Sequence, residues 1–396
     1  MIHPDPVCIV GTARTAMGAF QGVLDPVSAP QLGAAAIRAA VERAGIAPED
    51  TDEVIMGCVL PAGLGQAPAR QAALGAGLPE SAGCTTVNKM CGSAMKATMV
   101  AHDQLLAGSA RVMVAGGMES MSNAPYLLDK ARGGYRMGHG RIIDHMIFDG
   151  LEDPFGDGGL MGCFAEDTAE AYQFTRAAQD AFAITSLERA KRASDDGGFA
   201  AELTPVTVKT RKTETVIKRD EIPFKVDIAR IPQLRPAFRE GGTVTPANSS
   251  SISDGGAALV LMRRSEVERR GLTPLAVIHG HATFAQSPAL FPTAPIGALR
   301  NVLDRVGWET GEVDLYEINE AFAVVTMAAM RDLGLPHDKV NVHGGACALG
   351  HPIGCSGARI IVTLLGALNK HGLDRGVAAL CIGGGEATAI AIERVH

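Results

Sequence analysis

The sequence lacks most of the short signatures that mark a cofactor or a metal. Gly63-Leu64-Gly65 has two of the three glycines of a dinucleotide-binding loop, but the third is absent. No P-loop and no H-E-x-x-H motif occurs. The eight cysteines include no C-x-x-C pair and no zinc-type spacing. We therefore expect no cofactor, no resident metal and reduced thiols, as is typical of the cytoplasm.

Charge and hydropathy exclude two further classes of partner. The formal net charge is -7 at pH 7 and the pI is about 5.9, so a nucleic-acid-binding surface is not expected. No apolar run approaches the roughly 20 residues that a membrane-spanning helix needs. The first residues also lack the pattern of a signal peptide. We expect a cytoplasmic protein with neither nucleic acid nor membrane as a partner.

Small and apolar residues are abundant: the 396 residues include 47 glycines, and 46% are hydrophobic. This length permits two or three domains or one duplicated fold. Apolar strands and helices alternate in the first part of the chain, which indicates an α/β fold with a buried parallel or mixed sheet. The expected strands are 7–10, 54–59 and 112–117, and the expected helices are 31–44 and 92–106.

The rest of the chain divides into an insert and a second half. Residues 121–250 are rich in glycine, aspartate, methionine and proline, and we interpret them as a mostly irregular loop domain with helices at 166–172 and 176–194. We predict an N-terminal half from residues 1–120 plus about 251–273 and a C-terminal half from 274–396. The elements expected in that half are strands 275–279, 315–318 and 377–382 and helices 297–306, from 319, and 354–368.

A short internal repeat supports duplication of the two halves. Residues 112–119 match 379–386, because each segment has an apolar strand, two glycines, any residue and a glutamate. Each copy follows a glycine-flanked helix start, one at Cys91 and one at His351. We predict that these two residues occupy corresponding positions and converge where the halves meet.

Cys91 and His351 are the candidate nucleophile and base. Most free cysteines are buried structural residues, but Gly92, Ser93 and Ala94 leave room for a reactant beside this one. A helix N-terminus lowers the pKa of a thiol and offers N–H groups to an oxyanion. His351 lies in a glycine-rich turn and suits a base or an oxyanion donor.

Three further residues extend this reaction centre. Cys381 precedes a glycine turn, and a second thiol is useful where a proton moves to or from carbon. The N–H of Gly383 in that turn could serve a second oxyanion site. Asn319 opens an expected helix, so it is either a plain N-cap or a residue that positions a water. We expect His279 and His281 to share a strand face and to serve packing rather than metal binding.

Taken together, these residues resemble the thiolase family over essentially the whole chain. The family implies a duplicated α/β/α/β/α fold with an inserted loop domain, assembled as dimers or tetramers. It also implies that Cys91 becomes acylated, that His351 activates Cys91 and helps to bind the thioester oxygen, and that Cys381 is the acid/base at the acyl α-carbon. Asn319 would hold a catalytic water, and the N–H groups of Cys91 and Gly383 would form the second oxyanion hole. The likeness is carried by residues 65–71, 86–96, 116–122, 319–323, 344–357 and 381–386.

The resemblance further implies a reaction and its substrates. Acetyl-CoA and 3-ketoacyl-CoA would be the substrates, and two acetyl-CoA would condense reversibly to acetoacetyl-CoA by a ping-pong mechanism. Residues implied at the substrate are Leu151 and Ser250 at the pantetheine arm, Lys225 near the nucleotide phosphates, Phe291 at the acyl pocket, and Ala321 and Phe322.

Departures from the family pattern leave alternatives open. Leu160 stands where many biosynthetic members have histidine, and Pro246-Ala247 and Ser251 also differ, which bears on chain-length preference. One alternative is a broad 3-ketoacyl-CoA thiolase of fatty-acid or related degradation. A second is a decarboxylating ketoacyl synthase, but Asn319 fills the place of its second histidine. A third is an inactive acyl-CoA-binding paralogue, which would be expected to lose the nucleophile.

Overall fold

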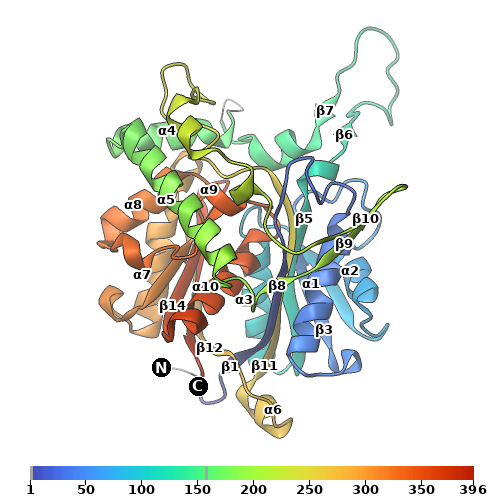
Figure 1. The fold of residues 1–396 in the computed structure, drawn as a ribbon. Coiled ribbons are helices and arrows are strands. Elements are labelled where there is room, and N and C mark those ends of the chain that lie inside the picture. Colours follow the sequence, from blue (N-terminus) through green and yellow to red (C-terminus); the bar gives the residue numbers. More distant parts are fainter. Residues whose placement is uncertain (1–2, 157–158) are drawn as a thin grey trace.

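The computed structural model describes residues 3–156 and 159–396. A large mixed sheet crosses the molecule in the order β13-β14-β15-β12-β1-β11-β5-β3-β4 (Figure 1). The strands of its first half are β1 (Val7–Thr15), β3 (Glu53–Gly57), β4 (Gly83–Val87), β5 (Val112–Ser120) and β11 (Ser253–Arg263). Those of its second half are β12 (Ala276–Ala285), β13 (Leu315–Ile318), β14 (Arg375–Ile382) and β15 (Glu386–Arg394).

The two halves of the sheet share one topology. β11 pairs antiparallel with both β1 and β5, and β5 pairs parallel with β3. In the same way, β15 pairs antiparallel with both β12 and β14, and β14 pairs parallel with β13. A bulge recurs between Ile9 and Gly11 of β1 and between Ile278 and Gly280 of β12. The predicted duplication is therefore confirmed.

The short repeat that suggested this duplication is nevertheless out of register by four residues. Counted from the matching bulges, Met113 of β5 is equivalent to Gly376 of β14, an offset of 263 residues. The same offset pairs the starts of α3 and α10, Ser93 with Ser356, so the two candidate residues do lie before corresponding helices. The counterpart of Cys91 itself is Gly354 rather than His351. Short apolar strands bounded by glycines match in more than one register, and only the strand pairing selects between them.

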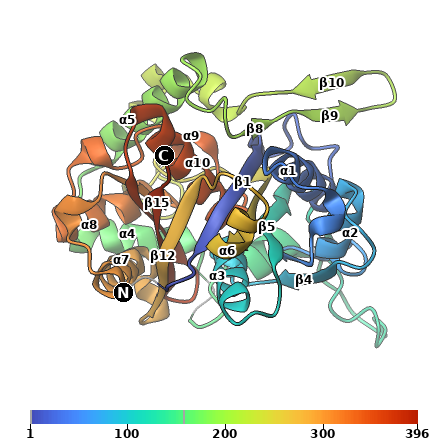
Figure 2. The same cartoon turned by 90° about the horizontal axis from the view of Figure 1, so that it is seen from below.

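The two halves of the sheet form two layers of the molecule, and helices form the other three. α1 (Ala29–Arg43) and α2 (Pro68–Ala76) cover the outer face of the first half, and α7 (Ala294–Val306) and α8 (Ala323–Leu333) cover that of the second (Figures 1 and 2). α3 (Ser93–Leu106) and α10 (Ser356–His371) pack together between the halves. A Cβ on Gly357 would lie 2.3 Å from the backbone N of Met95, so a side chain here would force the two helices apart. The predicted α/β/α/β/α arrangement is confirmed.

The segment from residue 121 to 250 contains two long helices and several short strands. The chain between β6 and β7 extends away from the body of the molecule (Figure 1). Arg14 of β1 is fully buried and holds the segment by hydrogen bonds to Asp220 (2.7 and 2.9 Å) and Glu202 (2.9 Å). Breaking such a buried ion pair costs about 3–5 kcal/mol. The elements are α4 (Met161–Ala171), α5 (Arg176–Asp195), β6 (Tyr126–Leu127), β7 (Ile143–Asp144), β8 (Leu203–Thr204), β9 (Val206–Lys209) and β10 (Glu214–Ile217).

Most predicted elements are present, with shifted ends. α8 begins at Ala323 rather than at Asn319, because the residues before it bond to a neighbouring loop instead: Ser250 N donates to the carbonyl of Ala321 (2.9 Å). Asn319 is therefore not an N-cap. Among the described residues, no helix is both long and apolar enough to cross a membrane. The remaining elements are β2 (Gly18–Ala19), α6 (Arg264–Arg269) and α9 (Ala346–Leu349).

Candidate active site

One cavity lies where the two halves meet, beside the N-termini of α3 and α10. Its volume is about 540 Å³ and its wall is mainly apolar. The structure places most of the predicted site residues on this wall, although they are up to 292 positions apart in the chain. Those that line the cavity are Cys91, Leu151, Ser250, Phe291, Ala321, Phe322, His351 and Gly383.

Cys91 lies in a tight turn two residues before α3. The preceding residue, Met90, has a φ of 46°, a left-handed conformation that residues other than glycine rarely adopt. Its strain of about 1–2 kcal/mol is held by bonds from Met90 N to Asn88 Oδ1 (2.9 Å) and from Ser93 Oγ to the Met90 carbonyl (2.6 Å). Such maintained strain is characteristic of functional sites, and here it precedes the candidate nucleophile.

The sulfur of Cys91 is surrounded by backbone donors but by no cation among the described residues. Burial raises the pKa of the thiol to about 11, although hydrogen bonds from the N–H groups of Gly383 and of Cys91 itself lower it. Lys89, the nearest basic residue in sequence, is paired with Glu386. The N–H groups thus act in the predicted direction, but the pKa as a whole is raised because the loss of water outweighs them.

His351 is buried, and burial together with the charge of Arg359 lowers the pKa of its imidazole to about 3. Nδ1 lies 2.5 Å from Ser356 Oγ, which also donates to the carbonyl of Pro352 (3.0 Å). Nε2 has no hydrogen-bond partner in the described part of the chain. His351 lines the same cavity as Cys91, and a neutral ring with a free nitrogen is the form in which a histidine acts as a general base.

Cys381 and Asn319 lie behind the cavity wall, where both are fully buried. Burial raises the pKa of the Cys381 thiol far above its ordinary value, and the nearby Cys91 raises it further. The Asn319 Nδ2 lies 3.5 Å from His351 Nδ1, and its Oδ1 accepts from Arg359 (3.4 Å). Asn319 thus lies between the histidine and a buried arginine.

Glu119 joins the two halves beneath the site, a role that was not predicted from the Gly-Gly-x-Glu motif that contains it. Its carboxylate accepts from the N–H groups of Val59 (3.0 Å), Leu60 (3.1 Å) and Gly354 (2.8 Å). A Cβ on Gly117 would lie 2.0 Å from the Gly354 carbonyl oxygen, so the two chains touch backbone to backbone. These contacts fix the turn that carries His351.

Lys225 is the one predicted substrate residue that the structure does not bring to the cavity. Its ammonium is paired with Glu221, on the same turn of chain, and its side chain is 58% exposed. In contrast, Phe238 lines the cavity and packs edge-to-face against Phe322 at a ring distance of 5.9 Å. No local sequence pattern predicts this position for Phe238, because a single aromatic residue in an irregular segment can pack against many partners until the chain has folded.

The reactivity of Cys91 is expected to rise with pH. Since its pKa is about 11 and that of His351 about 3, the pair is a neutral thiol and a neutral imidazole near pH 7. The thiolate fraction should then grow roughly tenfold per pH unit from pH 7 to 10. The rate of alkylation of Cys91 by iodoacetamide, followed by peptide mass spectrometry, measures this directly. A plateau at pH 6–8 would instead show a preformed thiolate–imidazolium pair.

The chain belongs to the thiolase family. A model of the thiolase N-terminal domain matches residues 7–265, and a model of the thiolase C-terminal domain matches residues 272–394. The protein is accordingly an acyltransferase with the thiolase fold.

Relatives of known name cover almost the whole chain. Acetyl-CoA acetyltransferase 2 of Arabidopsis thaliana is 51% identical over 99% of this chain and 98% of its own length. Acetyl-CoA acetyltransferase of Escherichia coli is 50% identical over 98% of this chain and 99% of its own. Among solved structures, the acetyl-CoA acetyltransferase of Bacillus anthracis matches with a TM-score of 0.96, 40% identity and 99% coverage of both chains. The Acat5 thiolase of Ascaris suum, solved in complex with coenzyme A, matches with a TM-score of 0.93 and 40% identity over 98% of this chain and 100% of that one.

Proposed function

We infer that the protein catalyses the reversible condensation of two acetyl-CoA to acetoacetyl-CoA and coenzyme A, as an acetyl-CoA acetyltransferase. The observation that carries this inference is a single cavity lined by Cys91, by Gly383, whose N–H lowers the pKa of the Cys91 thiol, and by His351 with its free Nε2. The full-length relatives named acetyl-CoA acetyltransferase support the same reaction. The proposed reaction needs no cofactor and no metal, because coenzyme A thioesters are the substrates themselves.

We propose that His351 acts first, as the base for Cys91. Its Nδ1–H donates to Ser356 Oγ, whose own proton goes to the Pro352 carbonyl, and this leaves the lone pair on Nε2. In thiolysis, Nε2 accepts the Cys91 proton as the sulfur attacks the C3 carbonyl of acetoacetyl-CoA. Charge then develops on the carbonyl oxygen, and the N–H groups of Cys91 and Gly383 are the available donors.

The carbon–carbon bond breaks in the next step of this proposal. The C2–C3 bond gives its electron pair to C2, and the thiol of Cys381 protonates that carbon, so that acetyl-CoA leaves. The raised pKa of Cys381 suits this role, because the group is a protonated acid at neutral pH. Asn319 would hold a water that donates to the enolate oxygen. The proton held by His351 then restores the Cys381 thiolate to a thiol. Coenzyme A finally attacks acetyl-Cys91 and gives its own thiol proton to His351, which passes it to the departing Cys91 sulfur as the second acetyl-CoA is released.

The cavity wall supports binding of the substrate's pantetheine arm. Leu151, Ser250, Phe291 and Phe322 offer a mostly apolar surface with one hydroxyl, as ligand sites commonly do. Lys225 would have to leave Glu221 to reach the nucleotide phosphates. We further propose a homodimer or homotetramer in the cytoplasm, and the free state of all eight cysteines supports a reducing compartment.

Chain-length preference tests the proposed substrate. Phe291 packs edge-to-face on Phe322 at 6.4 Å and on Phe164 at 6.1 Å, which closes one side of the cavity. We expect coenzyme-A-dependent cleavage of acetoacetyl-CoA to exceed that of a C8 3-ketoacyl-CoA by about 10-fold or more in kcat/KM. Phe291→Ala should narrow this ratio by opening the wall. Equal or faster cleavage of the C8 substrate by the parent protein would favour the broad 3-ketoacyl-CoA thiolase instead.

A further inference from the structure

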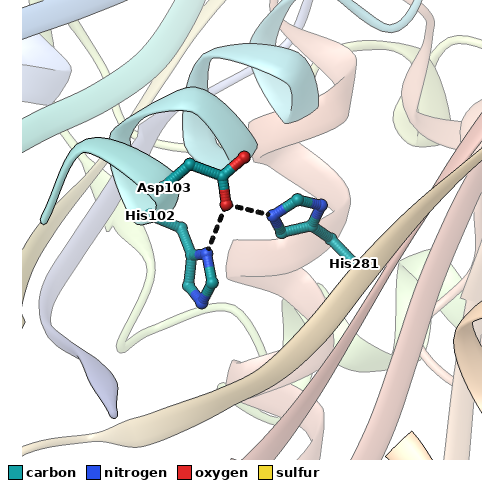
Figure 3. A group of neighbouring side chains, drawn as sticks. All are labelled: His102, Asp103 and His281. Carbon is teal, nitrogen blue, oxygen red and sulfur yellow. Dashed lines mark hydrogen bonds and ion pairs between the residues drawn. The ribbon is translucent and has the colours of Figure 1, made fainter. Parts of the chain in front are cut away.

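A second cluster of reactive side chains lies at the opposite end of α3 from Cys91. His102 and Asp103 occupy the last turns of α3, and His102 lies about 14 Å along the helix from its first residue, Ser93, at 1.5 Å per residue. His281 comes from β12 in the second half of the sheet. Figure 3 shows the three side chains pointing at one another. The cluster therefore spans the two halves and is separate from the candidate active site.

The donor atoms of the cluster are close together. Asp103 Oδ1 lies 3.0 Å from His102 Nδ1 and 2.9 Å from His281 Nε2. One donor atom from each of the three residues lies within 4.8 Å of the donor atoms of the other two. Both imidazole side chains are 11% exposed, whereas the carboxylate side chain is 60% exposed. One side of the cluster is thus fixed by packing, and the other is open to incoming ions.

The sequence predicted a packing role for both histidines of this strand. His279 does pack, against Trp308 at a ring distance of 4.8 Å, and it pairs with Glu393 (2.6 Å). His281 instead turns its Nε2 to a carboxylate and lies edge-to-face against the ring of His102 at 5.0 Å. The packing interpretation is therefore incomplete for His281, whose partner is 178 residues away in the chain.

Two imidazoles and one carboxylate match the preferences of zinc and its neighbours. Imidazole nitrogen suits Zn²⁺, Cu²⁺ and Ni²⁺, and three protein ligands with an open fourth position are common for zinc. Ligands at about 2.0–2.2 Å in a tetrahedron lie roughly 3.3–3.6 Å apart. The distances from Asp103 Oδ1 to the two histidine nitrogens fall just below this range. To bind an ion, Oδ1 must move slightly away from both nitrogens, and the two nitrogens must move closer to each other. The exposed Asp103 side chain has the freedom for that adjustment.

The surroundings leave room for the fourth ligand. The cluster opens into a hollow of about 320 Å³ that is also lined by His3 and His279. Arg305 lines it too and donates to the carbonyl of His281 (2.6 Å), so its charge works against a cation there. The anionic Asp103 opposes that charge as a direct ligand. Water or the exposed His3 can occupy the remaining position.

We propose that His102 Nδ1, Asp103 Oδ1 and His281 Nε2 bind one divalent transition-metal ion, with Zn²⁺ as the probe. The ion would join the end of α3 to β12 and so stabilise the contact between the halves. An ion that binds the folded chain alone stabilises it in proportion to the logarithm of ion concentration. The site takes no part in acyl transfer.

Zinc titration of the metal-stripped, full-length protein tests this proposal. Cys91 is first alkylated with iodoacetamide, so that the active-site thiol does not compete for the ion. Isothermal titration calorimetry should show one Zn²⁺ per chain, and Tm should rise with zinc concentration. His281→Gln and His102→Gln should each weaken zinc binding by about 100-fold or more. Loss of a residue that only hydrogen-bonds to a metal ligand typically weakens metal binding by about 10–100-fold, so a larger loss indicates a direct ligand.

His279→Gln is the matched control, because it lies on the same strand and lines the same hollow. It should keep the zinc affinity of the parent. Thiolase activity of the unalkylated variants, measured in a chelator, should equal that of the parent and thereby show that they are folded. No zinc uptake by the parent, or the same affinity in the parent and in His281→Gln, would overturn the proposal.

Discussion

Replacing Cys91 with serine is expected to reduce turnover of acetoacetyl-CoA by about 10⁴-fold or more, on the scale of nucleophile deletions in other covalent enzymes. A hydroxyl is far less ionised than a thiol at the same pH, and no cation is among the groups that shift the pKa at position 91, so nothing there offsets this. His351 cannot make up the difference, because a base with a pKa of about 3 is weaker still against an alcohol, which is far less acidic than the thiol. The acetyl-enzyme should also disappear. Mass spectrometry of the protein, mixed with acetyl-CoA and then rapidly quenched, measures this.

Cys84→Ser is the matched control for this variant. Cys84 is a partly exposed thiol on β4 that does not line the cavity, so turnover and the acetyl adduct should both persist. If Cys91→Ser retained near-normal turnover, the nucleophile would have to be assigned elsewhere. If the acetyl adduct appeared on another residue, the proposed path through Cys91 would be wrong as well.

Replacing Cys381 with alanine is expected to separate the two half-reactions. Acylation of Cys91 needs only the base and the oxyanion donors, so exchange of labelled coenzyme A into acetyl-CoA should stay within a few-fold of the parent. Cleavage and formation of the carbon–carbon bond need the proton of Cys381 and should fall by about 10²–10⁴-fold, the usual contribution of a general acid or base. Coenzyme A exchange and acetoacetyl-CoA cleavage, measured on the same preparation, give the two rates.

Cys8→Ala controls for the loss of a buried thiol. Cys8 is fully buried in β1, and its removal should leave both rates unchanged, apart from a modest loss of stability. An equal fall of exchange and cleavage in Cys381→Ala would contradict the division of roles. Such a result would point to a packing role for Cys381 behind the nucleophile.

The candidate site was largely accessible from the sequence because its residues lie in glycine-rich turns. Cys91, His351 and Gly383 are each flanked by small residues, a feature that local sequence displays and that the approach of a substrate requires. The alternation of apolar strands and helices likewise predicted the α/β layers. The fold is confirmed by its strand pairing, whereas the catalytic roles stay predictions until the variants are measured.

Other features depended on contacts between distant segments. Phe238 reaches the cavity only because the irregular segment folds over it, and Lys225 is held away from it by Glu221. Glu119 and Gly354 meet across 235 residues. The register of the internal repeat also could not be predicted from the sequence, because a shift of four residues preserves the pattern of apolar residues and glycines.

The sequence by itself predicted which residues would carry the chemistry, and it determined where the turns lie and that the chain has two related halves, since these follow from residue type and short-range pattern. The tertiary structure alone decided how the pKa values of Cys91 and His351 shift and what shape the cavity beside them has. It also decided that His102, Asp103 and His281 lie together. The physical reason is that desolvation, nearby charge and contact depend on all the atoms that surround a group. Most of those atoms belong to segments that are far apart in the chain, so no local stretch of sequence contains them.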